Sequence, residues 1–263
     1  VLRSDGSLET VADLAAAINI AVGGRGEVIL GAGDALRLTP AQTIRIQRGN
    51  LVIRGEDGTQ PVLALEEAGT RPFIETIGAS TITLRGVRVI AHFKRGSAKP
   101  SPLITAGGGL NLDHCIFQAR GQVTGSSIVK GFGAGLQVRN SLIDGFDLPF
   151  DLKAPPGSDV ALSQTIFMKP RAGDEPLGWV LRLQKEVSSG PNRNKPRRLR
   201  IDHCTLIAEG VVDLVDFAAN APLNVEVNQS AIQAKALVAW HAADGTAGKS
   251  TIEQKTLVWH GKG

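Results

Sequence analysis

Leu110–Phe117 reads LNLDHCIF, and Leu199–Leu206 repeats the pattern as LRIDHCTL. In both copies apolar and polar residues alternate, the alternation breaks at the fourth and fifth positions, and a small residue and a second apolar residue follow. Alternation with period two predicts a strand with one buried face, and the break predicts a tight bend between two short strands. Degenerate copies recur along most of the chain. Their third positions are Ile53, Leu84, Leu112, Val138, Leu162, Ile201, Val227 and Ile252.

The spacing of these third positions predicts the architecture. By subtraction, the successive steps are 31, 28, 26, 24, 39, 26 and 25 residues. Self-similarity at about 20–50 residues is typical of solenoids, propellers and arrays. A further short apolar run precedes each copy, so each repeat supplies about three strands, which is too few for a propeller blade of about 40–45 residues. The sequence therefore predicts an all-β fold, a single-stranded parallel β-helix of about seven to nine coils.

The residues at the bend support this prediction. Glycine, asparagine and histidine tolerate positive φ angles, although glutamine fits such a position less well. The sixth position is small or β-branched, as a crowded inward corner requires. His114 and His203 are therefore predicted to be bend residues rather than general bases. The fifth positions are Gly55, Gly86, His114, Asn140, Gln164, His203 and Gln229, and the sixth are Val87, Cys115, Ser141, Thr165, Cys204 and Ser230.

Cys115 and Cys204 occupy the same register three coils apart. Three strand spacings give about 14 Å, far beyond the ~7 Å between Cα atoms that a disulfide tolerates. The cysteines also lack the spacing of a zinc site. We therefore expect two free, buried thiols and no metal site.

Composition places limits on the class of protein. The 263 residues are expected to form one elongated domain, residues 1–263, and the formal charge of +4 does not indicate nucleic-acid binding. No apolar run approaches about 18 residues, so no membrane span is expected. No dinucleotide or nucleotide signature and no nucleophile motif is found, so no cofactor is expected. Without an initiating Met or a signal peptide, the chain is expected to be a mature or excised segment of a longer protein.

An amphipathic helix is predicted at the start, within residues 8–24. Thr10–Asp13 has the form of a capping box, and Val11, Leu14, Ile18 and Val22 follow at helical spacing. The simplest role is to cover the open core end of the first coil, although an Ala-rich helix could instead dock a partner.

Glu27–Leu30, which reads EVIL, and Leu51–Gly55, which reads LVIRG, follow this helix. Together with the strand–bend–strand copies, this opening resembles the right-handed parallel β-helix proteins of the pectate-lyase-like superfamily, over roughly residues 8–260. The resemblance implies a right-handed coil and favours a location outside the cytoplasm. The superfamily includes lyases, hydrolases, esterases, epimerases and non-enzymes, so the resemblance alone implies no particular activity.

The 39-residue step contains a predicted inserted loop, residues 170–197, which is rich in Gly, Pro and basic residues. Lys185, Arg193 and Lys195 make it the strongest basic region. The loop could simply be solvated, or it could form a wall over a groove that binds an acidic glycan.

The best candidate for an active site is a row of charged residues. If Phe150 and Leu152 and their counterparts on later coils point inward, Asp151, Arg182 and Asp213 point outward on three successive coils about 5 Å apart. Lys153 lies nearby, and Lys130 and His241 extend the row as binding residues. The alternative is a structural ladder of opposite charges. Calcium is expected only if the protein is a lyase, and the sequence lacks the adjacent acids near an Arg that such a lyase would need.

The C-terminal coils contain Trp240 and Trp259, which could cover the core end or form an interface for oligomerisation. Lys255 falls where the repeat requires a small inward residue, so either the register slips or the last coil opens.

These observations leave two functions. The first is a non-catalytic β-helix module that presents an extended face to a polysaccharide or a protein, as part of a larger extracytoplasmic protein. The second is a carbohydrate-active enzyme, a polysaccharide lyase or glycoside hydrolase, that acts on an acidic glycan.

Overall fold

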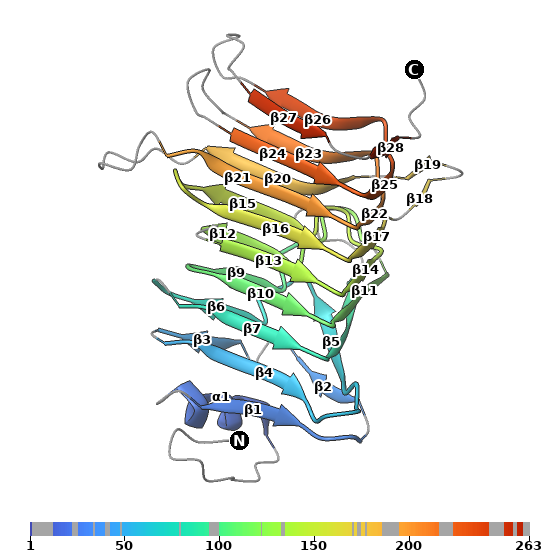
Figure 1. The fold of residues 1–263 in the computed structure, drawn as a ribbon. Coiled ribbons are helices and arrows are strands. Elements are labelled where there is room, and N and C mark those ends of the chain that lie inside the picture. The colour runs from blue at the N-terminus through green and yellow to red at the C-terminus, as the bar shows by residue number, and fades with distance from the viewer. Residues whose placement is uncertain are drawn as a thin grey trace.

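The computed structural model describes residues 1, 13–22, 26–33, 35–39, 43–47, 49–78, 80–94, 100–121, 123–132, 135–169, 171–172, 175–176, 178–185, 195–215, 223–241, 250–254 and 257–259. Within them the chain winds as a stack of coils, with one helix beside the first coil (Figure 1). Almost every strand pairs in parallel with its counterpart one coil away, so the predicted all-β parallel β-helix is confirmed.

Three parallel sheets form the sides of the stack, with nine, nine and eight strands among the described residues. Sheet A contains β1 (Glu27–Leu30), β4 (Leu51–Gly55), β7 (Ile82–Arg85), β10 (Leu110–Asp113), β13 (Gly135–Arg139), β16 (Asp159–Ser163), β21 (Arg197–Asp202), β24 (Leu223–Asn228) and β27 (Ser250–Gln254). Sheet B contains β2 (Leu36–Leu38), β5 (Val62–Ala68), β8 (Arg88–Phe93), β11 (Ile116–Gly121), β14 (Leu142–Asp144), β17 (Ile166–Met168), β22 (Thr205–Ile207), β25 (Ser230–Gln233) and β28 (Leu257–Trp259). Sheet C contains β3 (Ile44–Ile46), β6 (Ile74–Thr76), β9 (Ile104–Ala106), β12 (Val129–Phe132), β15 (Phe150–Ala154), β20 (Trp179–Lys185), β23 (Gly210–Val215) and β26 (Ala236–His241).

The predicted column of third positions is present in sheet A. Leu112 pairs with Leu84 on one side and with Val138 on the other, and the pairing continues through Val227. At the end the prediction is wrong by two residues, because Val227 pairs with Gln254 rather than with Ile252. This shift explains why Lys255 did not fit the repeat.

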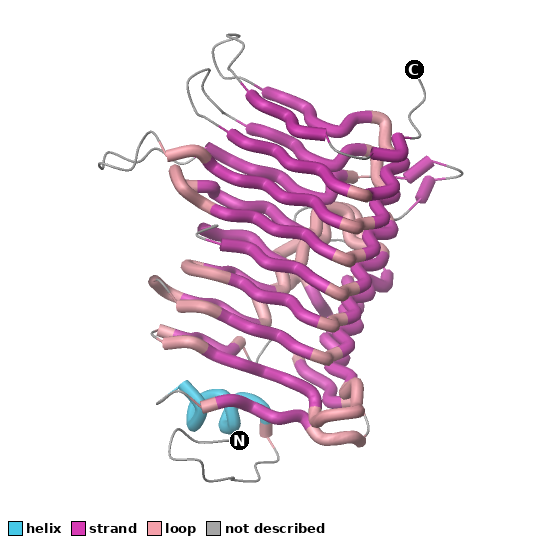
Figure 2. The backbone as a smooth tube through the Cα atoms, viewed as in Figure 1, coloured by secondary structure: helices cyan, strands magenta, loops and turns pink. Residues whose placement is uncertain are grey.

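The sharp corner between sheets A and B is formed by residues with left-handed backbone angles. His114 and His203 have φ angles of 53° and 52°, and Asn140, Gln164, Gln229 and Gly86 take the same conformation at this position. Figure 2 shows these short loops one above another along one edge of the stack. Gly55 differs, because it is the last residue of β4 and has no positive φ. Its glycine is required by close approach, since a Cβ there would meet the Gly86 carbonyl oxygen at 2.7 Å.

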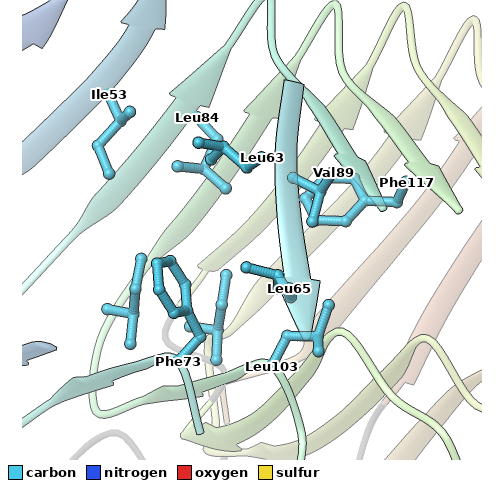
Figure 3. A pocket seen from close by; sticks show the side chains of 10 residues that line it. Ile53, Leu63, Leu65, Phe73, Leu84, Val89, Leu103 and Phe117 are labelled. Carbon is cyan, nitrogen blue, oxygen red and sulfur yellow. The ribbon is translucent and has the colours of Figure 1, made fainter. Parts of the chain in front are cut away.

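The interior is a continuous column of Leu, Ile, Val and Phe side chains. Phe150 and Phe167 meet edge to face, with ring centroids 6.0 Å apart. A small void of about 20 Å³ lies between the early coils. Figure 3 shows apolar side chains that line it, such as Phe73, Leu103 and Phe117. Because a void of this size holds at most about one water and has no polar lining, it is a packing defect and not a ligand site.

The helix α1 (Leu14–Val22) covers the core at the N-terminal end of the stack (Figure 1). Leu14, Ala17, Ile18 and Ala21 are buried, in contact with the cluster that fills the first coils. The Asp13 side chain caps the helix, because its Oδ2 accepts the Ala16 N–H at 3.0 Å. The predicted capping residue Thr10 lies outside the described residues.

The 39-residue step from Leu162 to Ile201 contains more regular structure than the predicted loop. β18 (Arg171–Ala172) and β19 (Glu175–Pro176) pair antiparallel, and β20 then joins sheet C. Of the predicted insertion 170–197, residues 170, 173–174, 177 and 186–194 lie outside the described residues.

Candidate functional site

The predicted charged row lies on sheet C, in the predicted register. Lys130 pairs with Asp151, Asp151 with Arg182, and Arg182 with Asp213, on β12, β15, β20 and β23. The same register position holds Arg45, Glu75 and the uncharged Thr105 on the three preceding coils. Neighbouring Phe150, Leu152, Leu181, Leu183, Val212 and Leu214 are buried in the core, as the predicted alternation requires.

Asp151 is held by side chains from the coils on both sides of it. The Lys130 Nζ lies 3.6 Å from Asp151 Oδ2, and the Gln184 amide donates to Asp151 Oδ1 at 2.6 Å. Although it belongs to the outward row, the Asp151 side chain is only 9% exposed. Because both oxygens are engaged, the carboxylate is fixed in place.

Asp213 forms a second, separate pair. The Arg182 Nε donates to Asp213 Oδ2 at 2.8 Å, and the Asp213 side chain is only 4% exposed. A buried carboxylate loses much solvation, and a close guanidinium compensates for that loss. The row is therefore a series of local ion pairs, as the structural alternative predicted, and each acid has a cation of its own.

A groove of about 600 Å³ lies beside this row. Lys130, Asp151 and Lys153 line it, whereas Arg182 and Asp213 are not among its lining residues. The three predicted catalytic residues of the row are therefore not gathered in one cleft. The complete lining is Thr76, Ile77, Gly78, Pro102, Thr105, Ala106, Gly107, Lys130, Gly131, Asp151, Lys153 and Gln184.

The other predicted binding residues are less well placed. His241 pairs with Val215, and the position next to Asp213 in the row is Ala239, so His241 does not extend the row as predicted. Lys195 is exposed, with its side chain close to Gly157 on the preceding coil. Arg193 and the side chains of Lys185 and His241 lie outside the described residues.

The histidine of the repeat belongs to a polar network at the corner between sheets A and B. The Asp113 carboxylate pairs with one arginine from each neighbouring coil: Arg139 Nε lies 3.2 Å from Oδ1, and Arg85 Nε lies 3.5 Å from Oδ2. His114 Nδ1 lies 2.8 Å from Oδ1. Burial by itself raises the pKa of the Asp113 carboxyl. Hydrogen bonds from Asn140 and His114 and the charge of Arg139 outweigh burial, so its pKa lies below the ordinary value. The network joins three coils, which supports a structural role for His114.

The corner also contains a repeated hydrogen bond that sequence reasoning missed. The side chain at the sixth position donates to the carbonyl two residues before it: Ser141 to Arg139 at 2.7 Å and Ser230 to Asn228 at 2.7 Å. Each serine oxygen also accepts the N–H of the cysteine one coil earlier, at 3.1 Å. The signal was present, because five of the six predicted sixth positions hold Cys, Ser or Thr, all of which can donate.

Lys169 has a buried amine that no sequence pattern indicated. Its Nζ donates to the carbonyls of Phe146 and Asp147 at 3.0 Å each, and to that of Trp179 at 2.6 Å. Complete burial holds the pKa of the Lys169 amine well below its usual value, while the charge of Asp147 opposes that shift. Lys169 therefore joins the corner before β15 to the start of β20, the strands that carry Asp151 and Arg182.

Both cysteines are free and buried, as predicted. Within the described part of the chain, no group of three or more His, Cys, Asp or Glu side chains is arranged to hold a metal ion. Nor does that part contain a helix with the length and apolar character needed to cross a bilayer.

Comparison of the sequence with models of known protein families gives no match, and no curated protein matches it. The parallel β-helix is therefore established by the structure alone, and membership of the pectate-lyase-like superfamily stays a prediction.

Proposed function

We propose that this chain is a non-catalytic binding module that presents the outer face of sheet C to a carbohydrate or protein ligand. One observation carries the proposal. The carboxylates of Asp151 and Asp213 are 9% and 4% exposed and each is paired with its own cation, whereas Lys130 beside the groove is 60% exposed. The groove therefore offers a ligand positive charge without an accessible pair of acids.

The chemistry of glycoside cleavage supports this choice. A hydrolase needs two carboxyl groups that reach the same glycosidic bond from opposite sides, about 5–9.5 Å apart. One of them must also donate a proton, which requires a raised pKa. Asp151 and Asp213 lie two coils apart in separate ion pairs, and only Asp151 lines the groove.

A carbohydrate-active enzyme is the competing function, and one observation favours it. Lys130, Asp151 and Lys153 line the same groove, so an acid and two amines face a common space. A lyase that used a lysine as its base would need such a placement.

Incubation of the protein with a panel of polyuronates separates the two functions. For a binding module we expect no new reducing ends and no unsaturated products at any pH between about 4 and 10. Product release by the wild-type protein that disappears in Asp151→Asn would show that the module is an enzyme.

Binding is tested with labelled oligouronates and labelled peptides on the same protein. We expect Lys130→Gln to lower the affinity of the protein for the ligand that binds sheet C. Lys94→Gln is the matched control, because Lys94 is 62% exposed and its Nζ lies 3.4 Å from Glu67, on another sheet. Equal effects of the two substitutions would exclude sheet C as the binding face.

We further propose that the module belongs to a larger protein outside the cytoplasm and that its C-terminal end is available for oligomerisation. The resemblance of the repeat to extracytoplasmic β-helix proteins supports the location. Fractionation of the source cells tests it, and recovery of the protein only with cytoplasmic markers would contradict it.

A further inference from the structure

The groove on sheet C has a definite length and direction. Its lining residues come from the coils of β6, β9, β12, β15 and β20, which are consecutive neighbours in the sheet. Four strand spacings of about 4.8 Å make it about 19 Å long, the length of about six residues of extended chain. It crosses the strands along the axis of the stack and suits a linear chain.

The two ends of the groove differ in chemistry. At the β6 and β9 end the lining includes Ile77, Pro102 and Ala106, and Ile77 is 54% exposed. At the β12 and β15 end it includes the exposed amines of Lys130 and Lys153. Because Asp151 is buried between Lys130 and Gln184, this end presents net positive charge.

Two polar side chains of the lining already have partners within the protein. The Thr76 hydroxyl oxygen accepts the Gly107 N–H at 2.8 Å, and the Gln184 amide is engaged by Asp151. A glycan chain carries hydroxyl groups on every ring, and those that face Ile77 and Pro102 would lose hydrogen bonds to water without replacement. A peptide can place an apolar side chain there instead.

We propose that the groove binds an acidic peptide segment of a partner protein, with an apolar side chain against Ile77 and carboxylates against Lys130 and Lys153. Two coils separate Ile77 from Lys130 and three separate it from Lys153. These separations of about 10 and 14 Å correspond to three and four residues of an extended peptide. The strand register places Lys153 in the column of Ile77, and Lys130 two residues earlier along its strand. Residue four lies on the same side of the peptide as the apolar side chain and reaches Lys153, whereas residue three lies on the opposite side and reaches Lys130. The proposal rests on the proposed binding function and names its partner.

The probe is a set of fluorescent six-residue peptides with Leu, Val or Phe near one end and Glu or Asp three and four positions away. Peptides with Lys in place of the acids, and labelled oligogalacturonate, serve as comparison ligands. We expect the acidic peptides to bind, the Lys peptides not to bind, and the affinity to fall with added NaCl. Lys130→Gln should weaken binding roughly fivefold, and Lys94→Gln should leave it unchanged.

A second pair of variants tests whether the peptide occupies the groove itself. Gly78 lines the groove with φ +75°, and a Cβ there would meet nothing within 4 Å. Asn tolerates a positive φ, so Gly78→Asn should narrow the groove without unfolding the protein. We expect it to lower the affinity for the peptide more than about tenfold. Gly58→Asn is the matched control, since Gly58 has φ +78° and equally open surroundings but is not among the groove residues.

The outcomes separate this proposal from the binding function. Binding of oligogalacturonate that depends on Lys130 and Gly78, without binding of the peptides, overturns the peptide proposal and leaves a binding module. Peptide affinity that is equal in Gly78→Asn and Gly58→Asn also overturns it. Cleavage of a polyuronate overturns the non-catalytic function, and the peptide titrations then decide the partner independently.

Discussion

At the scale of single residues, the corner between sheets A and B explains most of the repeat. The fifth position takes a left-handed conformation, and the sixth returns a hydrogen bond to the carbonyl two residues earlier. The identities at the fifth position predicted the first feature, because few residue types tolerate positive φ. The second was not predicted, since Ser, Thr and Cys were considered only for their size.

Ser141→Ala tests that hydrogen bond. The substitution leaves the buried N–H of Cys115 without the Ser141 hydroxyl that accepts it, so we expect the free energy of unfolding to fall by about 1–3 kcal/mol. Ser141→Thr should cost less, because the Thr165 hydroxyl occupies the same corner in the next coil and donates to the Ser163 carbonyl at 2.8 Å, as Ser141 does to Arg139. Urea denaturation measures both, and equal losses for Ala and Thr would contradict the role of the hydroxyl.

The two thiols give the protein a specific pH dependence. Burial raises the pKa of Cys115 and Cys204 from 9.0 to about 11. Because the folded state keeps its proton longer than the unfolded chain, this contribution to stability is complete below about pH 9 and is lost as pH rises through about 11. We expect the double variant Cys115→Ser and Cys204→Ser to lose less stability over this range than the wild type. Identical pH profiles would contradict the burial of the thiols.

At the scale of elements, the sequence predicted which strands lie side by side and which charges share a row. Period-two alternation in β15, β20 and β23 was sufficient to place Asp151, Arg182 and Asp213 on successive coils. It could not predict that the acids are buried, because that depends on how Arg182, Lys130 and Gln184 lie over them. Nor could it predict the support from Lys169, whose partners are backbone carbonyls with no signature in the sequence.

Arg182→Met tests the ladder. Asp213 is almost fully buried, so loss of the guanidinium should lower the free energy of unfolding by about 1–3 kcal/mol, discounted because the Arg182 side chain is itself 36% exposed. Arg45→Met is the matched control in the same row, where the exposed pair with Glu75 should contribute less than about 1 kcal/mol. If Asp213→Leu added to Arg182→Met brought no recovery in denaturant titrations, the pair would not be the cause.

At the scale of the whole molecule, the coils place equivalent residues over one another, and the groove exists only because five coils are stacked. The repeat spacing predicted the stack but not the groove. Gly78, Gly107 and Gly131 are among its lining residues. Gly131 is required by close approach, because a Cβ there would overlap the Ala106 carbonyl. The final coil was misaligned by two residues: Ile252 was assigned opposite Val227 but pairs with Val225. A shift of two residues leaves a period-two pattern unchanged, so alternation alone does not fix this register.

Cross-linking across one coil spacing tests the stacked register most directly. Asn111 on β10 pairs with Gln137 on β13, so Asn111→Cys with Gln137→Cys places two Cα atoms about 4.8 Å apart, within the range of a disulfide. We predict rapid oxidation of this pair. Thr83→Cys with Gln137→Cys spans two coils, about 10 Å, and should not cross-link. Cross-linking of the Thr83 pair at the same rate, or its absence in the Asn111 pair, would contradict the stack on which the proposed binding face depends.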